Sequence, residues 1–357
     1  MPDLVDLFSD TQSRPSAGMR EAMARAEVGD EQAGSDPATN ALCARVADLL
    51  GMEDAVFMPS GTMCNLVAIL VQTRPGDEIV VDGTSHIFNT EAAGAAAIAG
   101  VATLPLATRD GVFSAAQAEA AIRPAARTAP RPALISIENT TAFSGGSIWP
   151  LDTVREVRDV ARRHGLKAHM DGARLLNAVA ATGISAADYA AGFDSAWIDL
   201  SKGLGCPVGA VLCGTREFIV EAWRWKYRLG GAMRQSGVLA AAGLYALDHH
   251  VAQLGVDNDN AATLDRGLRA IDGIAFEAAT QSNILRFTVE GLNATAAAFV
   301  EACERRGVRF RATGAHEVRA TTHLDVDAEG ITRAIDVAGG VAAAFRRGGA
   351  GGSSPAA

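Results

Sequence analysis

The chain has 357 residues, of which 41 are acidic and 32 are basic, so its formal net charge is −9. This balance argues against nucleic acid and anionic membranes as partners, because both favour clustered Lys and Arg. The N-terminal residues lack the charged-then-apolar pattern of a signal peptide, and the longest weakly polar run, residues 92–107, is too short to span a bilayer. We therefore expect a cytoplasmic protein.

The cysteines and histidines show no ligand spacing. Five cysteines are scattered without C-x-x-C pairs, and an odd number of them in a long chain fits reduced thiols. Cys206 lies close to Lys202 in the sequence and could act as a nucleophile, but its small apolar neighbours favour packing. The seven histidines lack the paired spacing of metal ligands, so we predict no metal site.

Short apolar runs alternate with helical patterns in the N-terminal two thirds of the chain. Strands are predicted at residues 55–58, 78–82, 103–105, 133–137, 167–171, 194–199 and 208–213. Helices are predicted at residues 61–72, 90–99, 114–122, 151–164 and 185–190, then at 216–226 and about 235–252. This alternation predicts an α/β fold with a mostly parallel central sheet.

From about Asp257 the order of elements changes. A helix is followed by a strand at 283–289, a helix at 294–306, strands at 308–312 and 317–322, and a final helix at 328–346. We predict a large domain over residues 1–252, a small C-terminal α+β domain over 253–347 and a disordered tail over 348–357.

Two charged residues follow predicted buried strands of the large domain. Asp171 ends the strand at 167–171, and Lys202 follows the strand at 194–199 among Ser201, Gly203 and Gly205. A buried carboxylate needs a cationic partner, and a buried amine becomes a better nucleophile. Pyridoxal phosphate needs both groups, an amine for a Schiff base and a carboxylate for its pyridine nitrogen. The alternatives are an exposed lysine and a helix N-cap.

A third segment fits the phosphate of that cofactor. In Ser60-Gly61-Thr62 a strand ends and a helix begins, so backbone N–H groups and a hydroxyl can face an anion. An ordinary glycine turn with an N-cap is the alternative. With Lys202 and Asp171 downstream, we predict a phosphate site.

The ordered set of motifs resembles the L-threonine aldolase family, a branch of the fold-type-I pyridoxal phosphate enzymes. The resemblance extends over almost the whole chain, and the motifs that carry it are residues 6–11, 59–65, His86 with Glu91, 169–174, 201–209 and 318–326. It implies cleavage of β-hydroxy-α-amino acids to glycine and an aldehyde. It also implies a homotetramer, a dimer of dimers with active sites at a dimer interface.

The resemblance also implies roles for further residues. His86 would stack on the pyridine ring, and Ser9 would add a donor for the substrate carboxylate. Arg174 and Arg319 are candidates to hold that carboxylate, since a guanidinium matches it with two hydrogen bonds; Arg174 is also assigned to the cofactor site, and a surface salt bridge is the alternative for Arg319. Arg234 precedes a helix N-terminus, where a cation is disfavoured, which suggests a nearby anion such as the neighbouring subunit's phosphate.

Two positions depart from the family pattern. Thr141 stands where the family commonly has a histidine near the substrate hydroxyl, and Ala33 stands where it often has a tyrosine. An imidazole can accept a proton near neutral pH, whereas a threonine hydroxyl cannot do so unaided. We expect Thr141 to contact the substrate and to weaken the preference for L-threonine.

The expected reaction is a retro-aldol cleavage. The substrate amine displaces Lys202, and His86, a water ordered by Thr141 or the cofactor phosphate accepts the β-hydroxyl proton. A β-eliminating lyase or a transaminase of the same fold would share Lys202 and Asp171 but give different products. A cofactor-binding regulatory protein would show no turnover, and a nicotinamide-dependent oxidoreductase is disfavoured because no G-x-G-x-x-G follows the early strands.

Overall fold

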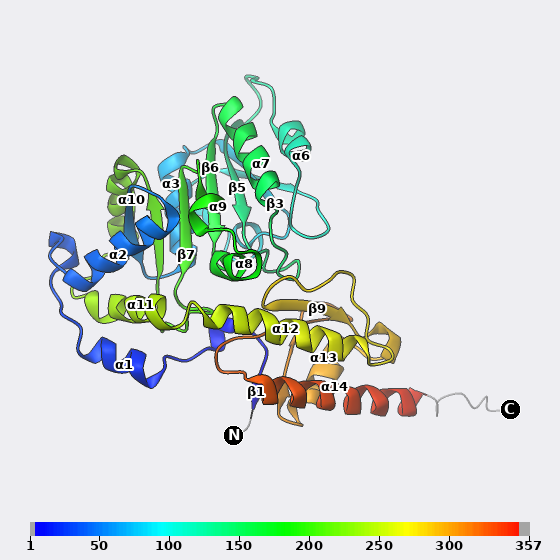
Figure 1. Cartoon of the computed structure of the whole chain (residues 1–357). Helices are drawn as coiled ribbons and strands as arrows, with labels where there is room; N and C mark the ends of the chain where they lie inside the picture. The colour runs from blue at the N-terminus through cyan, green and yellow to red at the C-terminus, as the bar shows by residue number, and fades with distance from the viewer. Residues whose placement is uncertain (1–3, 350–357) are drawn as a thin grey trace. The chain divides into compact units, whose positions relative to one another are not determined.

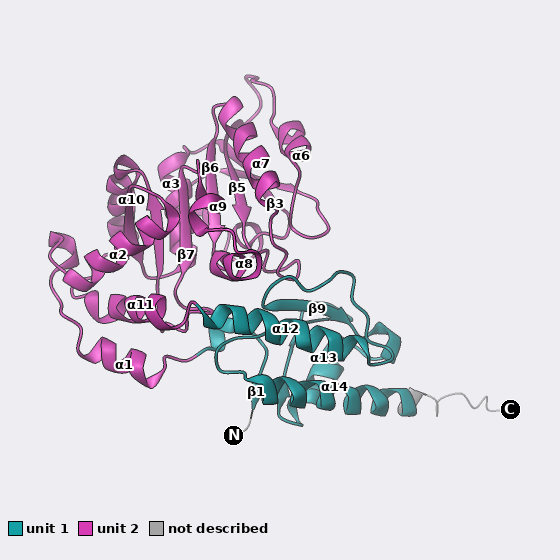
Figure 2. Cartoon of the chain, in the orientation of Figure 1, with its two compact units in different colours: residues 1–13, 252–357 teal, residues 14–251 magenta. Residues whose placement is uncertain are grey.

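The computed structural model describes residues 4–349, which form two compact units (Figure 2). Unit 2 contains residues 14–251, and unit 1 contains residues 1–13 together with 252–357. The predicted boundary between the domains lies after residue 252, and the boundary between the units lies after residue 251. The two divisions differ at the N-terminus, because β1 (Val5–Asp6) pairs in parallel with β10 (Val308–Arg309) of unit 1.

The core of unit 2 is a seven-stranded sheet with the order β2-β8-β7-β6-β5-β3-β4. Its strands are β2 (Asp54–Met58), β3 (Asp77–Asp82), β4 (Ala102–Leu106), β5 (Arg131–Glu138), β6 (Lys167–Gly172), β7 (Ser195–Asp199) and β8 (Ala210–Gly214). Only β8 runs antiparallel to its neighbours, and the other pairs are parallel. The predicted α/β fold with a mostly parallel sheet is therefore confirmed.

Helices lie in front of and behind this sheet in Figure 1. The helices of unit 2 are α1 (Ala17–Ala24), α2 (Pro37–Leu50), α3 (Gly61–Gln72), α4 (His86–Asn89), α5 (Gly94–Ala97), α6 (Ala115–Ala121), α7 (Leu151–Arg163), α8 (Leu175–Thr182), α9 (Ala186–Ala190), α10 (Arg216–Arg228) and α11 (Gly237–His249). On one face, Val67 of α3 and Ala222 of α10 share a buried cluster with Val56 and Leu212 of the sheet. Every residue of β3, β7 and β8 is buried, as expected for strands covered on both faces.

Unit 1 has its own core. A three-stranded antiparallel sheet of β9 (Ile284–Thr288), β11 (Arg311–Ala312) and β12 (Glu317–Thr321) is accompanied by α12 (Gln253–Arg269), α13 (Ala296–Glu304) and α14 (Ala328–Gly349). Phe287, Phe299 and Phe310 lie at the centre of the core, with ring centroids 5.9 to 6.3 Å apart.

Three local predictions were wrong. The helix predicted at 90–99 is reduced to the single turn α5, because Ala92 and Ala93 directly before it adopt positive φ angles of 50° and 56°. The single strand predicted at 308–312 is divided at Phe310 between two sheets. Residues 348–349 of the predicted tail end α14, and residues 350–357 lie outside the described residues.

Candidate active site

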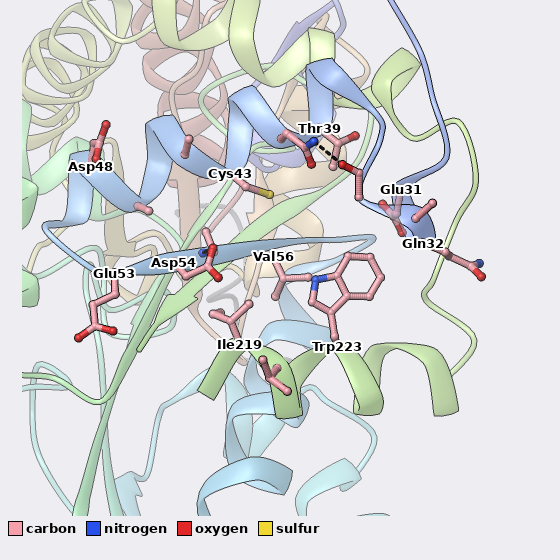
Figure 3. A pocket seen from close by; sticks show the side chains of 17 residues that line it. Glu31, Gln32, Thr39, Cys43, Asp48, Glu53, Asp54, Val56, Ile219 and Trp223 are labelled. Carbon is pink, nitrogen blue, oxygen red and sulfur yellow. Dashed lines mark hydrogen bonds between the residues drawn. The ribbon is translucent and has the colours of Figure 1, made fainter. Parts of the chain in front are cut away.

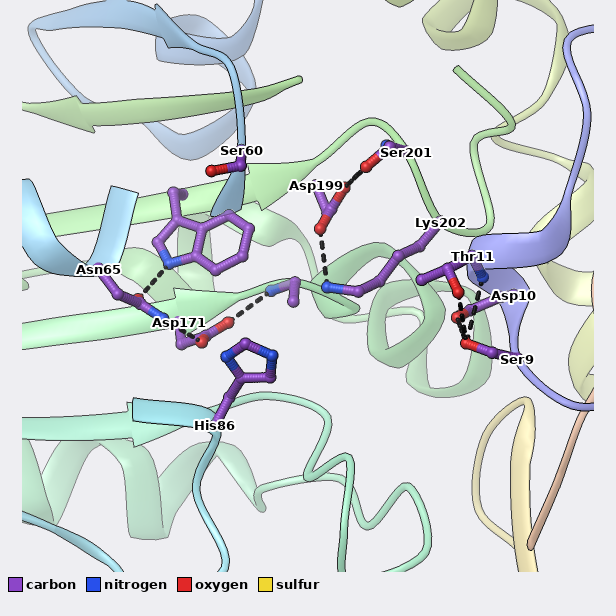
Figure 4. A network of polar contacts seen from close by, with 12 residues as sticks. Ser9, Asp10, Thr11, Ser60, Asn65, His86, Asp171, Asp199, Ser201 and Lys202 are labelled. Carbon is purple, nitrogen blue, oxygen red and sulfur yellow. Dashed lines mark hydrogen bonds and ion pairs between the residues drawn. The ribbon is translucent and has the colours of Figure 1, made fainter. Parts of the chain in front are cut away.

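Two neighbouring strands end at the centre of the site (Figure 4). β6 and β7 are parallel, with Asp171 aligned to Trp197, so their carboxyl ends meet at one edge of the sheet. β6 carries Asp171 at this edge, and Lys202 follows β7 by three residues. The strand ends predicted for Asp171 and Lys202 are therefore present.

Asp171 is a buried carboxylate, with 2% of the residue exposed. Its Oδ2 accepts a hydrogen bond from Asn65 Nδ2 at 2.8 Å, and its Oδ1 accepts one from the backbone N–H of Ala173 at 3.0 Å. Both donors are uncharged, so a cation at this carboxylate would be strongly stabilising. Asp171 is not the N-cap of α8, because Arg174 occupies that position.

Lys202 forms an ion pair that was not predicted. Its Nζ lies 2.7 Å from Asp199 Oδ2, and its side chain is 15% exposed. The other oxygen of Asp199 accepts hydrogen bonds from the backbone N–H and the hydroxyl of Ser201, at 2.7 and 2.8 Å. The sequence signal for this ion pair was Asp199, a carboxylate at the end of β7, three residues before Lys202.

The N-terminus of α3 lies against Trp197. A Cβ atom on Gly61 would stand 2.3 Å from the indole ring, so only glycine fits there. The same ring centroid lies 5.6 Å from Lys202 Nζ, which places the start of α3 near the amine. Ser60 is the N-cap, since its hydroxyl accepts the backbone N–H of Met63 at 3.2 Å, and Ser60 and Thr62 are exposed. This exposed helix N-terminus is suited to an anion.

His86 is held by two carboxylates. Its Nδ1 lies 2.8 Å from Glu91 Oε1, and its backbone N–H donates to Glu138 Oε2 at 2.6 Å. Burial alone would lower the pKa of His86, but the hydrogen bond to Glu91 and the charges of Asp171, Glu91 and Glu138 raise it above its usual value. About a third of the side chain, 34%, is exposed.

Glu138 joins His86 to the loop that contains Thr141. Its Oε1 accepts the backbone N–H of Ala142 at 2.7 Å, and burial, with the nearby charge of Asp171, raises its pKa to about 7. No role was predicted for Glu138. Its position at the end of β5, beside the strand of Asp171, was the available signal.

Thr141 is buried, and its hydroxyl already has two backbone partners. The hydroxyl donates to the carbonyl oxygen of Asp110 at 3.0 Å and accepts the backbone N–H of Ser147 at 3.1 Å. These two contacts brace the loop. A role of Thr141 at the substrate stays a prediction.

The predicted arginines fall into both units. In unit 2, Arg174 is buried directly before α8, and the exposed Arg234 forms a 2.8 Å ion pair with Asp30. Asp30 thus supplies an anion for Arg234 within the chain, and contact with a neighbouring subunit stays a prediction. In unit 1, Arg319 of β12 is buried and donates to the carbonyl oxygen of Phe8 at 3.5 Å, which brings it to the segment that carries Ser9.

A separate cavity of about 770 Å³ lies in unit 2 between α2, β2 and α10 (Figure 3). Ala33 contributes to its lining, but none of the predicted site residues does. Cys206 is buried, and burial raises the pKa of its thiol, as expected for a packed rather than a nucleophilic cysteine. Residues 4–349 contain no group of three or more His, Cys, Asp or Glu that could hold a metal ion.

Comparisons with known proteins agree with this geometry. A family model described as beta-eliminating lyase matches residues 6–290. The low specificity L-threonine aldolase of Escherichia coli (strain K12) is 41% identical over 327 residues, covering 91% of this chain and 96% of that protein. The solved threonine aldolase of Leishmania major has a TM-score of 0.82 at 22% identity, covering 94% of this chain and 99% of its own. The solved structure of Sphingomonas wittichii serine palmitoyltransferase has a TM-score of 0.75 at 18% identity, and the match covers 95% of this chain and 87% of that chain.

The residues present fit pyridoxal phosphate, since an amine, a buried carboxylate with only uncharged donors and an exposed helix N-terminus occur together. Fold and site thus define a pyridoxal-phosphate-dependent enzyme of fold type I. Within that class, the chain belongs to the beta-eliminating lyase family, and its resemblance to the L-threonine aldolases is confirmed.

Proposed function

We propose that the protein is a carbon–carbon lyase that cleaves L-threonine and related β-hydroxy-α-amino acids to glycine and an aldehyde. The observation that carries this proposal is the pair of Lys202 and Asp171 at adjoining strand ends, in a chain 41% identical to the Escherichia coli threonine aldolase. When bound, pyridoxal phosphate supplies an electron sink that stabilises negative charge at the substrate α-carbon. The protein's own residues must hold the cofactor, orient the substrate and move protons.

Four groups of unit 2 would hold the cofactor. Lys202 would hold the cofactor at its aldehyde carbon, and Asp171 would keep its ring nitrogen protonated. The backbone N–H groups of Gly61 and Thr62, with the Ser60 hydroxyl, would bind the phosphate at the start of α3. The neighbouring subunit's phosphate is the proposed partner of Arg234.

His86 is the residue that we propose as the acceptor of the β-hydroxyl proton, besides its role in stacking on the ring. Its side chain is partly exposed and is held by Glu91 through Nδ1. Thr141 is a weaker candidate for ordering a water, because its hydroxyl already contacts Asp110 and Ser147. A histidine at this position is a suitable general base near neutral pH.

The substrate α-carboxylate would be bound by Arg174, Arg319 and Ser9. A guanidinium pairs with a carboxylate through two parallel hydrogen bonds, which fixes the orientation of the α-carbon. Arg174 belongs to unit 2, whereas Ser9 and Arg319 belong to unit 1.

No helix within residues 4–349 is long and apolar enough to cross a membrane. We propose a cytoplasmic homotetramer, built as a dimer of dimers with active sites at a dimer interface, on the resemblance to the threonine aldolases. The small-molecule partner would be an amino acid, and the reaction would belong to glycine and amino-acid metabolism.

A product assay tests this function. The purified enzyme with pyridoxal phosphate is incubated with L-threonine, L-allo-threonine and L-phenylserine, and glycine, aldehyde and ammonia are measured separately. We expect glycine and aldehyde in equal amounts. Ammonia with a keto acid would instead show the β-elimination that the family's description names, and dependence on an added keto acid would show a transaminase.

A further inference from the structure

Asn65 of α3 is fully buried, and its amide uses all of its hydrogen-bonding capacity. Its Oδ1 accepts hydrogen bonds from Trp197 Nε1 at 2.7 Å and from His169 Nε2 at 3.0 Å. Its Nδ2 donates to Asp171 Oδ2 at 2.8 Å and to Glu91 Oε1 at 2.7 Å. One amide therefore connects the carboxylate proposed for the cofactor ring to the carboxylate that holds His86.

The orientation of this amide is determined by its partners. The indole N–H of Trp197 can only donate, whereas ionised Asp171 and Glu91 can only accept. A flipped amide would place two donors against the indole and an oxygen against both carboxylates. The oxygen of Asn65 must therefore face Trp197, and its nitrogen must face the carboxylates.

The network continues away from the site through His169. Burial lowers the pKa of His169 to about 3, so its ring is neutral, with one donor and one acceptor nitrogen. Since Nε2 donates to Asn65, Nδ1 accepts the hydroxyl of Ser195 at 2.7 Å, and Ser195 accepts Gln72 Nε2 at 2.7 Å. The carbonyl end of Asn65 is thus held by a neutral and well-ordered chain of donors.

Towards the site, the amide determines the proton on His86. Glu91 Oε1 accepts from Asn65, and the same oxygen lies 2.8 Å from His86 Nδ1. Burial raises the pKa of Glu91, and the hydrogen bonds with His86 and then with Asn65 oppose that rise. While Glu91 is ionised, Nδ1 of His86 donates to it, and Nε2 is the nitrogen that can accept a proton.

We propose that Asn65 is a positioning residue: it keeps Glu91 an acceptor and so holds His86 in the tautomer whose Nε2 takes the β-hydroxyl proton of the substrate. The transfer of the β-hydroxyl proton to Nε2 rests on the proposed function, whereas the effect of Asn65 on the tautomer of His86 does not. Without the amide, Glu91 takes up a proton and donates to Nδ1, which moves the ring hydrogen to Nε2. Asp171 and Glu138 also face His86; Glu138 has no printed contact with Asn65, whereas Asp171 loses its hydrogen bond from the amide.

The test measures the titration midpoint of His86 in the cofactor-loaded enzyme by deuterium exchange at the imidazole C2 carbon, followed by mass spectrometry. We expect Asn65→Leu to lower the midpoint by about one pH unit, because His86 loses an ionised partner. Gln72→Leu is the matched control, since it removes the far end of the same network, and it should leave the midpoint unchanged. In an E91Q background, Asn65→Leu should cause a clearly smaller shift, because only its contact with Asp171 is then lost.

Asn65→Ser, which leaves a small hydroxyl, replaces the leucine variant if that variant does not fold, and it should shift the midpoint in the same direction. In either variant kcat should fall at least about tenfold, with KM changed by less than about threefold. An unchanged midpoint in a folded Asn65 variant, or an equal shift in the Gln72 control, would overturn the proposal. The midpoint is measured without substrate, whereas the product assay of the wild-type enzyme tests the proposed function. A failure of this proposal can therefore be distinguished from a failure of the proposed function.

Discussion

At the scale of single residues, Asp171 shows how its surroundings determine the chemistry of a carboxylate. Its two hydrogen bonds come from uncharged donors, so a protonated ring nitrogen would be its charged partner. We predict that Asp171→Asn retains cofactor bound at Lys202 but lowers kcat by about a hundredfold or more, because an amide cannot stabilise that proton. Cofactor absorbance and kcat are measured on the same sample. Undiminished turnover would mean that Asp171 only holds the turn at Ala173.

Asp257 of α12 gives unit 1 a dependence on pH. Burial raises its pKa to about 7, the charges of Asp10 and Asp325 add to the rise, and the hydrogen bond from Gln253 opposes it. The unfolded chain releases this proton at its ordinary pKa of 3.8, so the contribution of Asp257 to the unfolding free energy falls between about pH 4 and pH 7 and is constant above that range.

Asp257→Asn should therefore stabilise the protein at pH 8, by on the order of 2 kcal/mol, and should have little effect at pH 4. Urea denaturation of the wild type and the variant at both pH values measures this difference. A variant that is no more stable than the wild type at pH 8 would show that Asp257 is not held protonated by the fold.

At the scale of elements, the start of α3 depends on its contact with β7. Trp197 cannot move away freely, because its Nε1 donates to Asn65. Gly61→Ala should cost about 1–3 kcal/mol and weaken cofactor binding about tenfold or more, since a Cβ would overlap the indole ring. Gly94→Ala in α5 is the control, because its Cβ would make only an ordinary contact, 3.8 Å from Leu66. Thermal unfolding and cofactor titration measure both effects, and equal behaviour of the two variants would contradict the proposed contact.

The loop after β5 bears on substrate choice. Thr141→His should raise the ratio of kcat/KM for L-threonine to that for L-phenylserine, because it adds a basic group near the substrate hydroxyl. It should also cost about 1–3 kcal/mol of stability, since the hydrogen bonds to Asp110 and Ser147 are lost. Thr141→Val loses the same two contacts without adding a base, so it should reproduce the destabilisation but not the change in ratio. A ratio that moves equally in both variants, or in neither, would contradict this role.

At the scale of the whole molecule, cofactor binding should contribute to stability. The chain has three lysines, and two are engaged elsewhere: Lys167 pairs with Asp194 on the surface, and Lys226 is buried against Glu31. Borohydride should therefore attach the cofactor at Lys202 alone. Removing the cofactor should lower the Tm by several degrees, because ligand at a hundred times its Kd adds about 2.7 kcal/mol. Calorimetry of both forms and peptide mapping check this, and an adduct on Lys167 or Lys226 would contradict it.

The sequence by itself determined the fold class and the strand ends that carry Lys202 and Asp171, because hydrophobic periodicity and glycine-flanked charged residues are local signals. Only the tertiary structure decided how side chains far apart in the sequence meet. Asn65 reaches Asp171 across 106 positions, and Glu138 reaches the backbone of His86 across 52. Such contacts depend on strand order and on how each helix packs against the sheet, and no local pattern of residues encodes either.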